Sequence, residues 1–242
     1  MFLFYRYWIK YLCFLKIRLL AYILNIETAT KNCSVSLAKN GETIALKELN
    51  SGGYSHAEKL HEFINEVIKE AGVKLSAINA VAVSKGPGSY TGLRIGVSAA
   101  KGLCFALDIP LISVNTLQAL ALSLSISEGV VIPLLDARRM EVYSSVFSPN
   151  NESLREVKAE IISSVSFSKY LEQGKVYLVG DGVEKCKEVI THKNAVFIDG
   201  KLPSANEMVM LSFEKFKTNE FEDVAYFEPF YLKDFVAIKS KK

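Results

Sequence analysis

The sequence predicts a two-lobed α/β fold in which each lobe contains a mixed β-sheet flanked by helices. Segments with strand-like patterns alternate with apolar segments of helical spacing along most of the chain, as an α/β sheet requires. A strand, turn and strand at residues 23–37 are echoed at residues 130–147, which indicates a duplicated lobe. Half of the 242 residues are hydrophobic and 23% are charged, which is typical of a packed globular protein. We therefore place the first lobe at residues 21–127 and the second at residues 128–242.

Residues 1–20 form an N-terminal extension that is apolar and aromatic but also basic. Its basic side chains are Arg6, Lys10, Lys16 and Arg18. They interrupt every apolar run before it reaches the roughly 18 residues that a membrane-spanning helix needs. Two interpretations stay open: a basic amphipathic segment at a membrane surface, or upstream sequence that is not translated.

The first lobe opens with a strand at residues 23–26, a tight turn at residues 27–32 and a hairpin that turns at Asn40 and Gly41. This order resembles the start of actin-like folds, the superfamily of sugar kinases and Hsp70. In its ATP-using members an acidic residue and then a glycine occupy the first turn, because phosphate lies against bare amides. Here Glu27 supplies the acid, but Ala29 and Thr30 stand where glycine is expected. Glu27 and Thr28 are the candidate nucleotide-binding residues of this turn.

The first long helix is predicted at residues 55–71. Ser55 is the candidate N-cap, with Glu58 three residues later. The apolar stripe consists of Leu60, Phe63, Ile64, Val67 and Ile68. This pattern predicts a helix that packs one face on the sheet.

Residues 81–107 read as a short buried strand, a glycine-rich turn and a second long helix. Gly86, Pro87 and Gly88 form the turn, and Ser89 or Thr91 can cap the helix. A P-loop needs Lys and then Ser or Thr after its last glycine, and a dinucleotide fingerprint needs two residues between its second and third glycines. The spacing fits neither motif.

Small residues recur along this helix at Gly92, Gly96 and Ala100. A glycine inside a helix costs about 1 kcal/mol against alanine, and close packing against a neighbour would offset that cost. Two alternatives stay open: the helix packs on its own sheet, or it is shared with a second protein. Arg94 lies off the apolar stripe and is free to face a partner.

Three segments resemble the TsaB family: GPGSYTGLRIG at residues 86–96, ILNIETAT at residues 23–30 and LLDARRMEVY at residues 134–143. The resemblance runs from about residue 21 to the C-terminus. It implies the non-catalytic dimerisation subunit of the bacterial complex that forms N6-threonylcarbamoyladenosine in tRNA beside the anticodon.

The resemblance also implies the partners. These are a metal-bearing catalytic subunit (TsaD-like), a P-loop ATPase (TsaE-like), tRNA through the complex, and a second copy of the chain when it is alone. ATP and metal are used by the partner subunits, so we expect no intrinsic cofactor. The expected interface residues are His56, Lys59, Leu60, Phe63, Gly92, Arg94, Gly96 and Ala100.

A metal site is not expected in this chain. By resemblance, the catalytic partner binds its metal through two histidines four residues apart on a helix. His56 and His61 are five apart, which places their side chains about 140° apart around the helix. Solvated or interface histidines are the better interpretation.

The alternation of elements continues through the rest of the chain. After residue 108 we expect strands at residues 109–114, 130–135, 141–147, 154–162, 176–179 and 196–198, and helices at residues 116–125, 166–172, 183–190 and 204–216. Residues 227–232 form an apolar tail that is expected to pack back on a lobe. Asp136 lies in the turn of the second repeat, where a capping role and a nucleotide-binding role both stay open.

Two other functions stay open beside the subunit role: a stand-alone actin-like ATPase or small-molecule kinase, and a metallopeptidase. The missing glycine after Glu27 argues against the first, and the spacing of the histidines argues against the second. The net charge of +3 is small, and no long basic stripe for nucleic acid interrupts the middle of the chain. The four cysteines form no CxxC pair, which suits a protein of the reducing cytoplasm.

Overall fold

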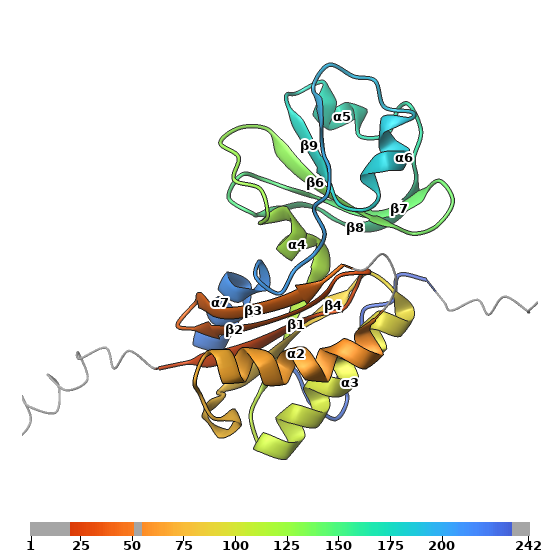
Figure 1. The fold of residues 1–242 in the computed structure, drawn as a ribbon. Coiled ribbons are helices and arrows are strands. Elements are labelled where there is room, and N and C mark those ends of the chain that lie inside the picture. The colour runs from red at the N-terminus through yellow and green to blue at the C-terminus, as the bar shows by residue number, and fades with distance from the viewer. Residues whose placement is uncertain (1–19, 51–54, 234–242) are drawn as a thin grey trace, which may run out of the picture.

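The computed structural model describes residues 20–50 and 55–233. Their strands form two five-stranded mixed sheets, one in each lobe (Figure 1). The first sheet has the spatial order β3 (Glu42–Leu49), β2 (Cys33–Lys39), β1 (Tyr22–Glu27), β4 (Ala80–Gly86) and β5 (Leu111–Asn115). The second has the order β8 (Ser153–Ile161), β7 (Glu141–Phe147), β6 (Val130–Asp136), β9 (Val176–Val179) and β10 (Ala195–Ile198).

The second sheet repeats the topology of the first. In the first lobe β1 pairs antiparallel with β2 on one side and parallel with β4 on the other, and β5 continues the parallel part. In the second lobe β6 pairs in the same way with β7 and β9, and β10 follows in parallel. This repeat confirms the predicted two-lobed α/β architecture and its duplication, which an actin-like fold requires.

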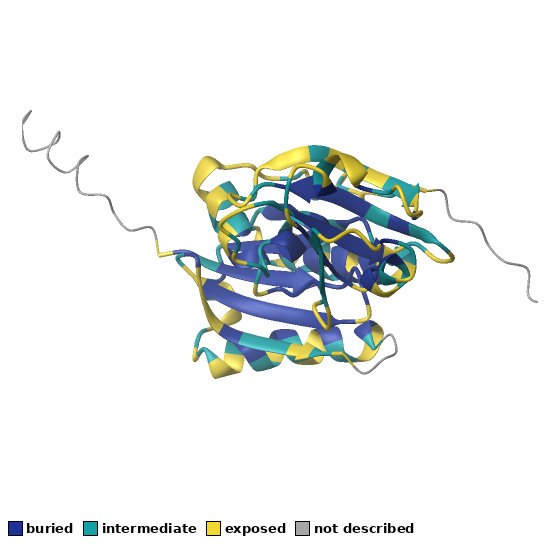
Figure 2. Cartoon of the chain, turned by 90° about the horizontal axis from the view of Figure 1, so that it is seen from above, coloured by how far each residue is buried: buried dark blue, intermediate teal, exposed yellow. Residues whose placement is uncertain are grey.

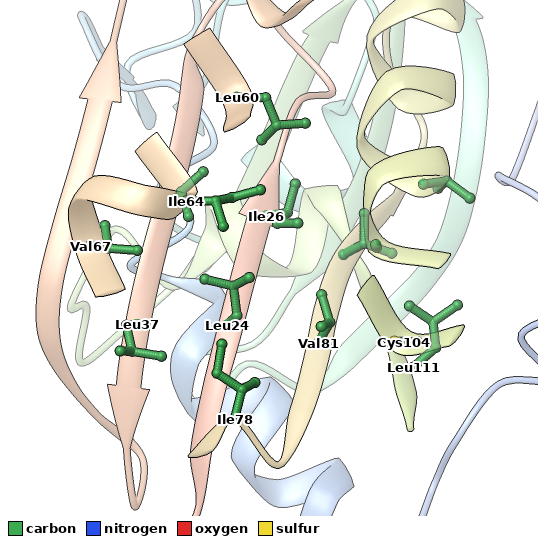
Figure 3. Packing of buried hydrophobic residues seen from close by; sticks show 14 of the residues in the cluster. Leu24, Ile26, Leu37, Leu60, Ile64, Val67, Ile78, Val81, Cys104 and Leu111 are labelled. Carbon is green, nitrogen blue, oxygen red and sulfur yellow. The ribbon is translucent and has the colours of Figure 1, made fainter. Parts of the chain in front are cut away.

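Two long helices, α2 (His56–Glu70) and α3 (Tyr90–Leu107), cover one face of the first sheet (Figure 1). The apolar stripe of α2 is buried as predicted, because Leu60, Ile64 and Val67 are at most 4% exposed. Figure 3 shows these side chains between α2 and the strands that carry Ile26 and Leu37. The core of the first lobe therefore lies under the two helices that were expected to bind a partner.

The opposite face of the first sheet is covered by α4 (Thr116–Ala121) and α7 (Met208–Thr218). Met208 and Ala205 pack with Ile23, Ala82 and other residues of the first sheet. The prediction placed this last helix in the second lobe, within residues 128–242, and the structure corrects that placement. The sheet needs apolar cover on both faces, and α7 returns from the second lobe to supply it.

The short helix α4 joins the two lobes and is buried from both sides. Ala119 belongs to the cluster on the first sheet, whereas Leu117 and Leu120 pack on the second sheet with Val131 and Leu135. Figure 2 shows that the buried residues concentrate in the strands of both lobes, with exposed residues on the outer helices and loops.

The remaining helical segments are short: η1 (Leu75–Ala77), α5 (Ser168–Leu171) and α6 (Val183–Lys187). The predicted helices at residues 166–172 and 183–190 are thus only partly helical. Phe167 takes a left-handed φ of 62° and buries its ring, so α5 begins after it. The predictions for residues 1–19 lie outside the described residues. None of the described helices has the length and apolar character needed to cross a membrane.

Candidate functional site

Glu27 ends β1 with a fully buried carboxyl group. Its Oε1 accepts hydrogen bonds from the backbone N–H of Ala29 at 2.6 Å and from Oγ of Ser84 at 2.9 Å. Burial removes the carboxylate from water and raises the pKa of Glu27 to about 7, although these hydrogen bonds oppose the shift. The acid predicted for this turn therefore ties the turn to β4 inside the protein.

The turn after β1 lies directly on α3. A β-carbon at Gly92 would come within 2.1 Å of the carbonyl oxygen of Thr28, and one at Gly96 within 2.3 Å of its Oγ1. The backbone N–H of Ser89 donates to the carbonyl oxygen of Ala29 at 2.7 Å, and Ser89 Oγ accepts from the N–H of Gly92 at 3.3 Å. Ser89 is therefore the N-cap of α3. Because Gly92 and Gly96 have no side chains, the turn after β1 can pack directly against this helix.

These contacts correct the expected partner surface. Gly92, Gly96 and Ala100 are buried inside the chain, so the bare flank of α3 packs against its own lobe. Of the two alternatives for this flank, packing within the lobe is confirmed. The missing side chains make room for Thr28, and this contact explains the glycines without a second protein.

His56 and Leu60 also point inward, although both were expected at the partner surface. His56 is 1% exposed, and its Nε2 donates to the carbonyl oxygen of Thr30 at 2.7 Å. Burial lowers the pKa of His56 below its ordinary value. Leu60 is fully buried in the core under α2. These two residues support the fold of the first lobe and lie beneath its surface.

Lys59 and Phe63 lie nearer the surface of α2 and stay predicted interface residues. Lys59 Nζ pairs with the carboxylate of Glu62 at 2.7 Å on the exposed side of the helix. Phe63 is half-buried and packs against the edge of the core.

Arg94 is exposed on α3 and is held by two tyrosines. Its guanidinium carbon lies 4.3 Å from the centroid of the Tyr90 ring, and its Nε donates to the hydroxyl of Tyr231 at 3.3 Å. The two tyrosine rings lie 5.0 Å apart between centroids. This arrangement fixes the exposed cation at the surface of α3, and its role in binding a partner stays a prediction.

A shallow groove of about 560 Å³ lies beside Arg94 and extends to α2; we call it the α2–α3 groove. Its lining residues are His61, Arg94, Ile95, Ser98, Ala99, Gly102 and Leu103. A β-carbon at Gly102 would meet nothing within 4 Å, so small residues leave the backbone of α3 close to the surface here. Apart from Arg94, the predicted interface set missed these residues. The four-residue spacing of Ser98 and Gly102 was the available signal.

The end of the described chain, residues 221–233, runs along the first lobe and is named the C-terminal strap. The backbone N–H of Glu222 donates to the carbonyl oxygen of Leu111 at 2.8 Å, and that of Phe230 donates to Lys85 at 2.7 Å. Lys233 then pairs with Glu141 of the second lobe. The predicted packing of the apolar tail is confirmed, and this path brings Tyr231 to Arg94.

Asp136 ends β6 at the position that Glu27 occupies in β1. Its Oδ1 accepts from the backbone N–H of Arg138 at 2.6 Å and pairs with Lys185 Nζ at 2.7 Å. The turn-capping role is therefore observed. The structure places Glu27 and Thr28 together beneath α3 and places Asp136 in the other lobe, and the nucleotide-binding role of these residues stays a prediction.

The described residues contain no group of three or more His, Cys, Asp or Glu side chains arranged to hold a metal ion. His56 is buried at the start of α2, whereas His61 is exposed in the α2–α3 groove.

Comparison with known proteins decides the family. The chain is 31% identical to "tRNA threonylcarbamoyladenosine biosynthesis protein TsaB" of Escherichia coli (strain K12), over 90% of this chain and 96% of that protein. It is 32% identical to the Haemophilus influenzae protein of the same name, over 90% of this chain and 95% of that one. The chain belongs to the TsaB family.

This TsaB family member is also similar to proteins described as tRNA N6-adenosine threonylcarbamoyltransferases. The family model described as "TsaD: tRNA N6-adenosine threonylcarbamoyltransferase" matches residues 52–240. A Staphylococcus aureus (strain JH9) protein named tRNA N6-adenosine threonylcarbamoyltransferase is 38% identical, over 47% of this chain and 38% of its own length.

Solved structures agree with the family assignment. The structure described as "YeaZ from Pseudomonas aeruginosa" superposes with a TM-score of 0.73 at 25% identity, covering 88% of this TsaB family chain and all of that one. A second Pseudomonas aeruginosa structure, described as an uncharacterized protein with similarity to peptidase YEAZ, gives 0.75 at 26% identity with the same coverage.

Proposed function

We propose that this chain is the non-catalytic dimerisation subunit of the complex that forms N6-threonylcarbamoyladenosine in tRNA. Its relatives are named for that biosynthesis, which supports the process in which it acts. In this proposal the chain binds and supports the metal-bearing, TsaD-like catalytic subunit. The single observation that carries the proposal is the α2–α3 groove with its exposed small residues.

The groove has the properties of a helix-docking surface. Ser98, Ala99 and Gly102 keep side chains short, so that a partner helix can approach the backbone of α3. Ile95 and Leu103 add partly exposed apolar contact. Arg94 and His61 add polar side chains to the same lining, which matches the mixture of apolar and polar groups in protein interfaces.

The proposal assigns the chemistry to other subunits. The space after β1 is taken up by the contact of Thr28 with Gly92 and Gly96, and the carboxyl group of Glu27 is buried beside it. ATP would be used by a P-loop, TsaE-like ATPase and the metal by the TsaD-like subunit. The tRNA would be bound through the assembled complex in the cytoplasm, and the free chain would pair with a second copy.

Size-exclusion chromatography with the TsaD-like subunit tests the proposed surface. Gly102→Arg places a long charged side chain at the groove, and its β-carbon would meet no atom within 4 Å. Gly174→Arg is the matched control, since Gly174 is equally open but lies in the second lobe. We expect Gly102→Arg to abolish co-elution and Gly174→Arg to preserve it. A folded Gly102→Arg variant that still co-elutes would place the interface elsewhere.

A further inference from the structure

A second hollow lies between the two lobes and plays no part in the proposed partner surface. It has a volume of about 350 Å³ and lies where β4 and β5 end, opposite β7 and β8; we call it the inter-lobe pocket. Its volume falls in the range of small-molecule sites, roughly 300–1,000 Å³. In α/β proteins, the carboxyl ends of parallel strands are the usual place for ligands.

The wall from the first lobe offers hydrogen-bond donors. Asn115 Oδ1 accepts from the backbone N–H groups of Leu117 and Gln118 at 2.9 and 3.2 Å, which fixes the amide and leaves its Nδ2 as a donor. Lys85 and Gln118 also line the pocket, and their side chains make no hydrogen bond or ion pair with any described residue. The Lys85 ammonium group, the Gln118 carboxamide and the Nδ2 group of Asn115 therefore line this side of the pocket as hydrogen-bond donors.

The wall from the second lobe offers acceptors. The hydroxyl of Ser153 donates to the carbonyl oxygen of Arg155 at 3.2 Å, so its lone pairs stay open to a ligand. Glu156 adds a carboxylate that forms no ion pair within the described part of the chain. Among the described residues, the charged side chains that line the pocket are thus one cation and one anion, on opposite lobes, and they do not pair with each other.

Apolar groups complete the lining. Phe230 of the C-terminal strap borders the pocket and is fixed by the hydrogen bond from its backbone N–H to the carbonyl oxygen of Lys85 at 2.7 Å. Val157 borders it from β8. These side chains give a hydrocarbon group a place beside the polar walls.

We propose that the inter-lobe pocket binds a free α-amino acid. The carboxylate would be bound by Lys85 with the carboxamides of Asn115 and Gln118, and the ammonium group by Glu156 with Ser153. The ligand side chain would lie against Phe230. A zwitterion matches one positive and one negative wall, whereas the phosphate of a nucleotide would bring about two negative charges to a single lysine and face Glu156.

Isothermal titration calorimetry on the full chain tests this proposal. The probes are the twenty protein amino acids, with AMP and inorganic phosphate for comparison. We expect at least one amino acid to bind with one-to-one stoichiometry. Lys85→Met and Glu156→Gln should each raise its Kd by about tenfold or more, because each removes one charge-assisted contact.

Matched controls separate the pocket from general changes in charge. Lys31→Met and Glu152→Gln remove exposed charges that do not line the pocket and should leave Kd unchanged. Circular dichroism checks that the pocket variants are folded, as we expect because the side chains of Lys85 and Glu156 form no hydrogen bond or ion pair with the described residues. The proposal is overturned if no amino acid binds, if only AMP or phosphate binds, or if binding survives in both pocket variants.

Discussion

The carbonyl oxygen of Thr28 lies against the α-carbon of Gly92 so closely that a β-carbon there would come within 2.1 Å of it. Real β-carbons do not approach backbone oxygen atoms at that distance, so the turn after β1 and the first turns of α3 fit only with glycine at this position. The contact links the first strand of the lobe to the helix whose outer side carries the α2–α3 groove.

Gly92→Ala is therefore expected to destabilise the protein. We expect the free energy of unfolding to fall by about 1–3 kcal/mol, because the turn or the helix must shift to admit the methyl group. The matched control is Gly102→Ala on the exposed side of the same helix, which should raise the free energy of unfolding by up to about 1 kcal/mol. Urea unfolding followed by circular dichroism measures both. Equal effects of the two variants would contradict the packing of Thr28 on Gly92.

Glu27 is expected to make stability fall as pH rises towards neutrality. Its carboxyl group titrates near 4.5 in the unfolded chain and near 7 in the folded protein, so the folded state holds more protons between these values. The stability that Glu27 contributes is fully present below pH 4.5 and is lost as the pH rises through about 7. This contribution amounts to about 3 kcal/mol. We expect the free energy of unfolding, measured with urea between about pH 5 and 8, to decrease less in the Glu27→Gln variant than in the unmodified protein.

Buried His56 titrates with the opposite sign, because its pKa is lowered in the folded protein. The quantity to compare is therefore the difference between the unmodified protein and the Glu27→Gln variant at each pH. Glu188→Gln, an exposed substitution in the second lobe, serves as control and should leave the pH dependence unchanged. Parallel curves for the unmodified protein and Glu27→Gln would show that Glu27 titrates normally.

Arg94→Ala is expected to weaken partner binding without unfolding the chain. Arg94 is exposed and contacts the rings of Tyr90 and Tyr231 outside the buried core, so the free energy of unfolding should change by about 0.5 kcal/mol or less. Arginine is one of the residue types enriched among binding hot spots, so we expect the Kd for the TsaD-like subunit to rise about tenfold. Surface plasmon resonance measures the change. The exposed control Lys201→Ala should bind normally, and an equal loss in both variants would point to a general charge effect.

The free chain is expected to release no phosphate from ATP above the rate without protein. The turn after β1 packs on Gly92 and Gly96, and Asp136 is engaged by Lys185. A phosphate-release assay on the purified chain tests this, with Asp136→Asn as the second sample. ATP hydrolysis that disappears in Asp136→Asn would instead favour the stand-alone ATPase or kinase.

The sequence predicted those parts of the fold whose residue pattern is compatible with a single arrangement. The echo of residues 23–37 in residues 130–147 predicted a duplicated lobe, because strand alternation and turn residues recur at matching places. It could not place α7. The apolar residues of that helix, among them Met208 and Val209, would cover either sheet equally well, and only the three-dimensional path shows that it returns to the first lobe.

The site was harder to predict than the fold. Gly92 and Gly96 correctly indicated a close approach to α3, but a missing side chain does not say what approaches. The approaching group, Thr28, is separated from them by more than sixty positions in the chain. The exposed small residues Ser98 and Gly102 were missed because the regular four-residue spacing of Gly92, Gly96 and Ala100 is the stronger pattern on this helix. The inter-lobe pocket joins residues of both lobes and the C-terminal strap, and no local pattern brings those together.

The return of α7 has a consequence for how the protein is made. During translation the strands and helices of the first lobe leave the ribosome first, yet the face of the sheet with Ile23, Ala82 and Ile112 receives Ala205 and Met208 only near the end of synthesis. Until then the nascent chain exposes an apolar surface that its own sequence has not yet covered. A product cut short before residue 205 would keep that surface open and be prone to aggregate. The sheet of the first lobe is thus fully covered only when the C-terminal part of the chain has been made.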